Sequence, residues 1–207
     1  EVETMAHLRA ARFFCPEVTA LLDIGGQDMK YCRLKDGRID HISLNGVCSS
    51  GCGSFLESFA DHLHMDIKEF ARQAALAEKM PDLGRHCTVI MNSYVKKVQN
   101  RGVGLADLAA ALSVSVVKNA LFSVIQLESA EELGDHIVAE GGTFYNDAVL
   151  RAFERLTGKE VIRPDIAGLM GAYGIALKAK DQFGEQHVSS LPGAAEIKAF
   201  HMETENR

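Results

Sequence analysis

A carboxylate followed by two glycines stands at the end of an apolar run early in the chain. The segment reads Asp23-Ile24-Gly25-Gly26-Gln27-Asp28. A carboxylate at the end of a buried strand can hold Mg²⁺ through water, and the free N–H groups of a Gly-Gly turn can hold phosphate oxygens. In such a site Gln27 is suited to orient a water molecule. The alternative interpretation is a plain hairpin in which Asp23 only forms the turn.

A second apolar run ends in the same way, and its segment reads Val138-Ala139-Glu140-Gly141-Gly142-Thr143-Phe144-Tyr145-Asn146. Such a turn can lie against a base or a ribose, and the N-terminus of the helix that follows favours phosphate. The alternative is an ordinary loop between a strand and a helix. The Walker A, dinucleotide-binding and Gly-x-Ser-x-Gly motifs are absent. Because the chain has two strand–Gly-Gly turns and none of these motifs, the sequence favours a nucleotide-binding cleft that does not use them.

The chain has five cysteines, Cys15, Cys32, Cys48, Cys52 and Cys87. Cys48 precedes a helix expected near Phe55, and Cys87 directly precedes one expected near Thr88. The dipole at a helix N-terminus stabilises a thiolate or an iron–sulfur cluster. The spacings match neither a zinc ribbon nor a ferredoxin, so a partner chain or domain would have to supply the remaining ligands. The alternative is that they are small buried hydrophobes, which we favour for Cys15 and Cys32.

The elements that position these residues follow from the hydrophobic periodicity. Strands are expected over residues 18–24, 29–34 and 39–44, joined by turns at 25–28 and 35–38. Helices are expected over 55–63, 67–75, 89–98 and 105–127, the last of them long enough to bend. A strand at 137–139, a helix capped by Asn146, a strand at 160–162 and a helix at 167–180 complete the order. Small residues in this final helix would suit a close approach to a sheet or a ligand.

This order predicts an α/β fold with a mixed sheet, in which three antiparallel strands are followed by helices and a βαβα segment. It fits one lobe of the actin-like nucleotide-binding fold, and other α/β folds as well. The 207 residues are 47% hydrophobic and 24% charged, which excludes disorder and coiled coil. A net charge of −6 argues against nonspecific nucleic-acid binding. The sequence has no uninterrupted run of 18 apolar residues, so we expect no membrane span. The number of cysteines is odd, which favours reduced thiols in the cytoplasm.

Five segments, in order, resemble the activator ATPases of 2-hydroxyacyl-CoA dehydratases, a family that includes the ATPase subunits of benzoyl-CoA reductase. They are residues 23–28, Asn45 with residues 48–57, residues 87–89, Gly141-Gly142 with Asn146, and residues 168–172. The resemblance extends from about Glu1 to Lys180. The sequences around Cys48 and over residues 164–168 resemble the long members, which carry two such domains in one polypeptide.

The resemblance implies an actin-like ATPase (ribonuclease H-like) lobe that binds ATP or ADP with Mg²⁺. The two residues it makes catalytic are Asp23, which would hold Mg²⁺, and Gln27, which would position the attacking water. The nucleotide-binding residues it implies are Asp23, Gly25, Gly26, Gln27 and Asp28 on the phosphate side, Gly141, Gly142 and Asn146 on the adenosine side, and Gly171.

The resemblance also implies that Cys48 and Cys87 ligate a [4Fe–4S] cluster shared with a second copy of the domain, in a homodimer or a tandem chain. ATP hydrolysis would change the angle between the helices that hold the cluster. One low-potential electron, received from a donor such as ferredoxin or flavodoxin, would then pass to a 2-hydroxyacyl-CoA dehydratase or a related reductase.

Two features depart from the family pattern. The Gly-rich first phosphate loop, Gly-x-Asp-x-Gly-Ser/Thr, has no match, so we expect residues 1–182 to be the second half of a family unit and 183–207 to be a polar tail. Cys52 stands where short members usually have Thr, which makes it an extra thiol rather than a ligand. Two other functions stay open: a small-molecule kinase of the same fold without a cluster, and a non-enzymatic dimerisation or docking domain.

Overall fold

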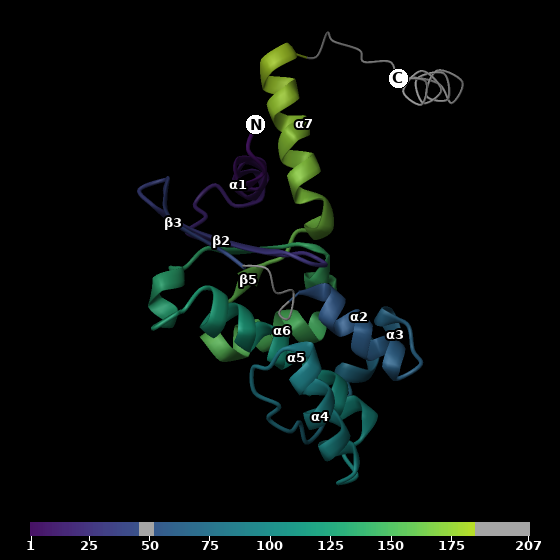
Figure 1. Cartoon of the computed structure of the whole chain (residues 1–207). Helices are drawn as coiled ribbons and strands as arrows, with labels where there is room; N and C mark the ends of the chain where they lie inside the picture. Colours follow the sequence, from purple (N-terminus) through teal and green to yellow (C-terminus); the bar gives the residue numbers. More distant parts are fainter. Residues whose placement is uncertain (46–51, 185–207) are drawn as a thin grey trace, which may run out of the picture.

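A five-stranded mixed sheet lies between two groups of helices in the computed structural model of the chain, which describes residues 1–45 and 52–184 (Figure 1). The strand order is β3-β2-β1-β4-β5. The antiparallel strands are β1 (Ala20–Ile24), β2 (Met29–Lys35) and β3 (Arg38–Leu44), and the strands added in parallel are β4 (Ile137–Glu140) and β5 (Val161–Ile162). The predicted mixed sheet and the predicted succession of strands along the chain are confirmed.

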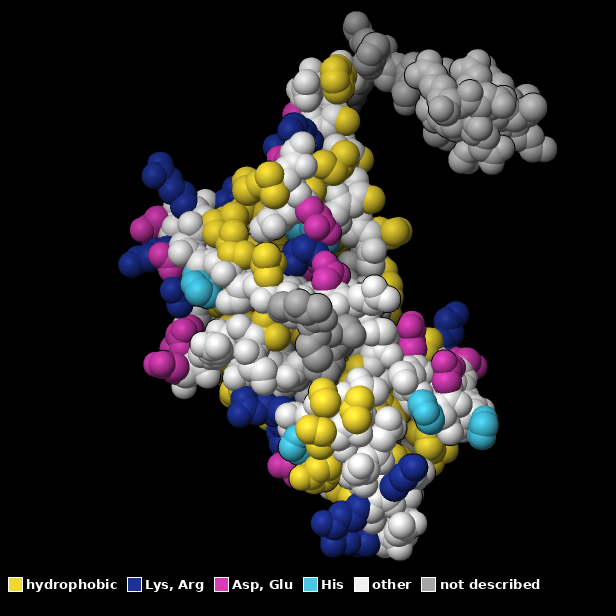
Figure 2. Space-filling model, in the orientation of Figure 1, with side chains coloured by type: hydrophobic (Ala, Val, Ile, Leu, Met, Phe, Trp, Pro, Cys, Tyr) yellow, Lys and Arg dark blue, Asp and Glu magenta, His cyan; other side chains and the backbone are white. Residues whose placement is uncertain are grey.

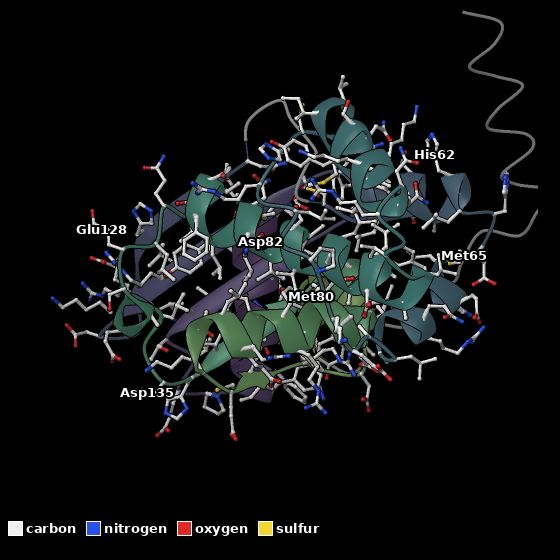
Figure 3. All side chains as sticks on the ribbon, turned by 90° about the horizontal axis from the view of Figure 1, so that it is seen from below. His62, Met65, Met80, Asp82, Glu128 and Asp135 are labelled. Atoms are coloured by element: carbon white, nitrogen blue, oxygen red, sulfur yellow. The ribbon has the colours of Figure 1, made fainter. Side chains whose placement is uncertain are left out.

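The two groups of helices cover opposite faces of the sheet (Figure 1). On one face lie α1 (Glu3–Phe14) and α7 (Met170–Phe183). On the other lie α2 (Gly53–His62), α3 (Ile67–Ala74), α4 (Thr88–Gln99), α5 (Leu105–Asn119) and α6 (Asp147–Thr157). Figure 3 views this second group from below, with Asp82 near its centre and Glu128 and Asp135 at its edge. Short helical segments complete the order: η1 (Ala120–Val124), η2 (Ala130–Leu133), η3 (Gly142–Tyr145) and η4 (Ala167–Leu169).

Strand β1 contributes to two hydrophobic clusters because successive side chains point to opposite faces of a sheet. Leu22 and Ile24 belong to the larger cluster, which contains buried residues of α2, α5 and α6. Leu21 belongs to the smaller cluster, with Cys32 of β2 and apolar residues of α1. The residue that continues the row of Leu21 at the end of the strand is Asp23, so its side chain faces the α1 and α7 layer.

Helix α1 is the element that the sequence interpretation missed. Its Ala-rich inner side, with Ala6, Ala10 and Ala11 buried, lies against the sheet and α7. The conformation of Val2 at its N-cap is extended and provides no side-chain cap, so the sequence carries no capping signal there. Burial against the sheet therefore stabilises this helix more than local sequence does.

The small residues of α7 allow it to press on α1. A Cβ atom added at Gly174 would lie 1.8 Å from the carbonyl oxygen of Ala6, and one added at Gly171 would lie 2.7 Å from Nε2 of His7. Only glycine fits at position 174, where the neighbour is a backbone atom. The final helix does make a close approach, but its neighbour is helix α1 and not the sheet or ligand that the sequence analysis expected.

The long predicted helix is also present, as α5 continued by the π-helical segment η1. Leu105–Val124 is long and apolar enough to cross a membrane by length and composition alone, with a mean hydropathy of 1.5 over its most apolar window. However, 61% of that window is buried inside the chain, as in the core helix of a globular protein. Packing against α3 and α6 in the core accounts for this apolar composition.

Candidate functional site

A cavity of about 790 Å³ opens where the carboxyl ends of β1 and β4 meet α1 and α7. Its lining comes from the N-terminal part of the chain into α1, from β1 and β2 at the turn that joins them, from the turn after β4, and from the segment that runs from η4 into α7. On this face Figure 2 shows acidic, basic and histidine side chains gathered beneath α7. Ligands of open α/β sheets bind at the carboxyl ends of the strands, so this cavity is the candidate site.

Three charged side chains form one row across the end of the sheet. Asp23 of β1 pairs in register with Lys30 of β2 on one side and with Glu140 of β4 on the other. All three are buried, and Glu140 is 0% exposed. The next row into the sheet is Cys32, Leu21 and Val138, which is apolar. The charged row therefore marks the boundary between the hydrophobic interior and the cavity.

His7 of α1 contacts the acidic part of this row. Its Nδ1 lies 2.6 Å from Oε2 of Glu140 and 3.8 Å from Oδ2 of Asp23. Burial raises the pKa of Glu140 to about 7, against the opposing effect of the His7 hydrogen bond. Burial lowers the pKa of His7, but the hydrogen bond with Glu140 and the charge of Asp23 outweigh it, so the net shift is upward. Oε1 of Glu140 is buried and has no hydrogen-bond partner among the described residues.

Lys30 is surrounded by carboxylates. Its Nζ contacts Oδ2 of Asp28 and lies 3.1 Å from Oε1 of Glu3 and 3.6 Å from Oδ2 of Asp23. Burial lowers the pKa of Lys30, but the bonds with Asp28 and Glu3 outweigh it and raise the pKa above its usual value. Burial raises the pKa of Asp23, while the positive charges of His7 and Lys30 pull it down.

The two Gly-Gly turns contact each other. A Cβ atom added at Gly141 would lie 2.2 Å from the carbonyl oxygen of Ile24, and the φ angle of Gly141 is +89°, so only glycine fits there. Thr143 Oγ1 donates a 2.9 Å hydrogen bond to the carbonyl oxygen of Gly25. The turns that the sequence placed 116 residues apart thus form one wall of the cavity.

The N-terminus of α2 is bound to the first of these turns. The backbone N–H of Gly53 donates to the carbonyl oxygen of Gly25 at 2.9 Å, and that of Ser54 donates to Gly26 at 2.7 Å. The segment that leads from Cys52 into α2 is therefore hydrogen-bonded to the turn that follows Asp23.

Seven of the nine predicted nucleotide-binding residues line the cavity: Asp23, Gly25, Gly26, Asp28, Gly141, Gly142 and Gly171. Gln27 is exposed and lies outside the cavity lining, so the cavity gives no support to its predicted water-positioning role. Asn146 also lies outside the lining, where its side chain accepts a 2.9 Å hydrogen bond from the N–H of Ala148 and caps α6. Its Nδ2 is buried and has no hydrogen-bond partner within residues 1–45 and 52–184.

The predicted cluster cysteines are placed only in part. Cys48 lies outside the described residues. Cys87 is half-buried and occupies the N-cap of α4, as predicted, with no side-chain capping bond. Cys52 is 0% exposed at the N-cap of α2, and Cys15 and Cys32 are buried. Within residues 1–45 and 52–184, no three His, Cys, Asp or Glu side chains are arranged to hold a metal ion.

Sequence reasoning missed four residues of this site: Glu3, His7, Lys30 and Glu140. Glu140 had a signal, because it precedes Gly141-Gly142 much as Asp23 precedes Gly25-Gly26. Lys30 also had one, because strand alternation places it on the face of the apolar residues Cys32 and Leu34. Glu3 and His7 had none without helix α1.

The sheet, its helical layers and the cavity at the strand ends define a chain with the actin-like ATPase fold. The sequence profile described as the BadF/BadG/BcrA/BcrD ATPase family matches residues 1–179, and the chain belongs to this family.

Similar proteins agree with this assignment. The 2-hydroxyisocaproyl-CoA dehydratase activator of Clostridioides difficile is 32% identical over 184 residues, which are 88% of this chain and 68% of that protein. The (R)-2-hydroxyglutaryl-CoA dehydratase activating ATPase of Acidaminococcus fermentans is 30% identical over 177 residues, 86% of this chain and 66% of that protein. The solved structure of the activator from Clostridium difficile with bound ADPNP superposes with a TM-score of 0.78 at 29% identity, covering 92% of this chain and 71% of that one. The chain thus spans about two thirds of the length of these relatives.

Proposed function

We propose that this chain is part of an ATP-dependent activator that transfers a low-potential electron to a 2-hydroxyacyl-CoA dehydratase or a related acyl-CoA reductase in the cytoplasm. One observation carries the proposal. The cavity is lined by both predicted nucleotide-binding turns, and the turn after Asp23 is hydrogen-bonded to the helix that follows the Cys48–Cys52 segment. The activating proteins of Clostridioides difficile and Acidaminococcus fermentans, which are similar to this chain, support the same function.

The cavity suits a nucleotide with its metal ion. Mg²⁺ usually keeps several waters and is bound by one or two carboxylates together with phosphates of the substrate. Asp23 at the end of β1 fits this role, since it lines the cavity beside Gly25 and Gly26. The N–H of Gly25 is already donated to the carbonyl oxygen of Asp28 at 2.9 Å, so phosphate would be bound by other groups of this turn. Bound Mg²⁺ would neutralise phosphate charge. The Gly141-Gly142 turn offers a glycine surface for the base or ribose, as the sequence predicts. The N–H of Gly141 donates a 2.8 Å hydrogen bond to the carbonyl oxygen of Ala167 in η4, which also lines the cavity.

The cysteines are the second part of the proposal. Cys87 is accessible at the start of α4, and the neighbouring Val89, Ile90 and Tyr94 are exposed at 80%, 49% and 40%. An apolar surface around a thiol at a helix N-terminus suits a cluster shared with a second copy of the domain. A bound [4Fe–4S] cluster, held by Cys48 and Cys87 from each copy, would store the electron.

The hydrogen bonds from Gly53 and Ser54 to the turn at Gly25-Gly26 connect the nucleotide cavity to the start of α2, the helix that follows Cys52. A phosphate group bound by this turn changes the environment of the same backbone that holds the start of α2. We therefore expect nucleotide exchange to shift the start of α2 relative to α4, which is a population shift between two arrangements.

Nucleotide binding is tested by calorimetry of the chain with Mg²⁺ and ADPNP. Wild type is expected to bind, and Asp23→Asn is expected to lose at least tenfold in affinity, because the carboxylate that faces the metal is removed. Asp36→Asn, an exposed residue of the turn between β2 and β3, is the matched control. Absence of ADPNP binding in wild type would support a docking domain without nucleotide function.

The cluster is tested by iron and sulfide analysis after anaerobic reconstitution. About two irons per chain, lost in Cys48→Ala and in Cys87→Ala and retained in Cys15→Ala, are expected for a four-iron cluster shared by two copies. Nucleotide binding with no iron in any preparation would instead support a small-molecule kinase of the same fold. In the cluster-loaded protein, Asp23→Asn is expected to abolish nucleotide-stimulated reduction of the partner enzyme while leaving the iron content unchanged.

A further inference from the structure

The ammonium group of Lys30 occupies the acidic side of the cavity. It contacts Asp28 and lies 3.1 Å from Glu3 and 3.6 Å from Asp23, and Lys30 is 8% exposed. These three carboxylates come from the turn after β1, from helix α1 and from the end of β1. A buried lysine with three carboxylate neighbours is a fixed cation rather than a mobile surface charge.

The position of this cation matters for a divalent metal. Asp23 is the carboxylate we propose for Mg²⁺, and its other positively charged neighbour, His7, lies 3.8 Å away. An ammonium group 3.6 Å from Oδ2 of Asp23 repels a second cation at the same carboxylate, and the repulsion is strong where the protein excludes water. Without Lys30, the described residues of the cavity lining would hold four carboxylates, those of Glu1, Glu3, Asp23 and Asp28, and one basic side chain, that of His7.

A nucleotide changes this balance. Its phosphates bring negative charge and oxygen ligands, which Mg²⁺ binds readily together with one carboxylate. The metal then enters the cavity as part of a complex whose net charge is negative, and Lys30 attracts that complex rather than repelling it.

We propose that Lys30 is the resident counter-ion of the nucleotide cavity, which keeps a bare divalent cation away from Asp23 so that the metal enters only together with a nucleotide. This inference rests on the proposed nucleotide-binding function. The role assigned to Lys30 is to exclude the bare metal ion, which differs from binding phosphate. If Lys30 only bound phosphate, replacing it would leave the affinity for the metal ion without nucleotide unchanged.

The test is a titration of Mn²⁺, followed by electron paramagnetic resonance of the free ion, without nucleotide and then with ADPNP. Wild type is expected to bind bare Mn²⁺ at this site only weakly and to retain it when ADPNP is present. Lys30→Met is expected to bind one bare Mn²⁺ per chain about tenfold more tightly, because one repulsive charge is removed. Addition of Asp23→Asn to Lys30→Met is expected to remove this gain.

Three controls complete the design. Lys35→Met changes an exposed lysine of the same strand and is expected to behave as wild type. Lys30→Arg keeps the charge and is expected to exclude Mn²⁺ as wild type does. Lys30→Gln repeats the neutral substitution with a polar side chain, and circular dichroism checks that each variant is folded.

Tight binding of bare Mn²⁺ by wild type, lost in Asp23→Asn, overturns the proposal whatever the variants do. Equal Mn²⁺ affinities in wild type and in a folded Lys30→Met or Lys30→Gln overturn it as well. A wild type that binds no ADPNP contradicts the proposed function instead, and the Mn²⁺ comparison without nucleotide still reports on Lys30.

Discussion

Nδ1 of His7 lies 2.6 Å from Oε2 of Glu140, which joins residues 133 positions apart in the chain. The contact connects helix α1 to the end of strand β4, which neighbours the central strand β1, and places an imidazole on the wall of the cavity. A fully buried carboxylate with one hydrogen-bonded partner is costly when charged, so this pair makes the free energy of unfolding depend on pH.

Glu140 is expected to lower stability as the pH rises. Its pKa of about 7 in the folded chain exceeds the ordinary value of 4.5, so the folded state holds a proton that the unfolded state has released between these values. The free energy of unfolding therefore falls with rising pH across this window, by about 1 kcal/mol per pH unit. The raised pKa of His7 acts in the same direction, because its stabilisation is present below pH 6.5 and is lost as the pH rises through the folded value.

Chemical denaturation from pH 5 to pH 8 measures this effect. Glu140→Gln keeps a hydrogen-bonding partner for His7 and removes the charge, so the slope in this variant is expected to be smaller than in wild type. Glu17→Gln, an exposed carboxylate, serves as the control. Equal slopes in wild type and Glu140→Gln would contradict the prediction.

Thr143→Val is expected to weaken nucleotide binding about fivefold. The substitution keeps the branched shape and removes the hydroxyl that donates to the carbonyl oxygen of Gly25, a bond worth ~1 kcal/mol. The carbonyl keeps its bond from the N–H of Gly53, so the chain stays folded. Calorimetry with Mg²⁺ and ADPNP measures the change, and Thr143→Ser, which keeps the hydroxyl, should bind nearly as wild type does. A loss of the same size in Thr143→Ser would assign the effect to packing.

Asn146→Ala is expected to lower the free energy of unfolding by ~1 kcal/mol, since it removes the acceptor that caps the N–H of Ala148 at the start of α6. Asn146→Asp keeps this acceptor and is expected to stay within about 0.5 kcal/mol of wild type. Urea denaturation compares the two, and equal losses would argue against the cap. The ADPNP affinity of Asn146→Asp separately tests the adenosine-side role that the family resemblance implies for Asn146.

Gly174→Ala is expected to lower the free energy of unfolding by about 1–3 kcal/mol. The added Cβ would stand 1.8 Å from the backbone carbonyl oxygen of Ala6, and a backbone atom cannot turn aside as a flexible side chain does. Thermal and urea denaturation measure the loss. Ala176→Ser, at an exposed position of the same helix, is the control. Unchanged stability in Gly174→Ala would show that α1 and α7 can separate without cost.

The sequence by itself determined the local elements of this protein. Period-two alternation and the Asp36-Gly37 turn are properties of adjacent residues, and they predicted the hairpin of β2 and β3. The placement of Cys87 just before α4 and of Asn146 at the cap of α6 also depends on neighbours in the chain. The two strand–Gly-Gly turns were visible for the same reason, and both line the cavity.

Only the tertiary structure decided which distant side chains meet at those turns. Lys30, Asp23 and Glu140 share one row because β1 pairs with β2 on one side and with β4 on the other, which no local pattern encodes. Helix α1 is stabilised by burial against α7 and the sheet. Capping residues and hydrophobic periodicity therefore did not predict this helix or its cavity residue His7. Motifs depend on near neighbours, whereas the charges that surround a bound ligand depend on long-range packing.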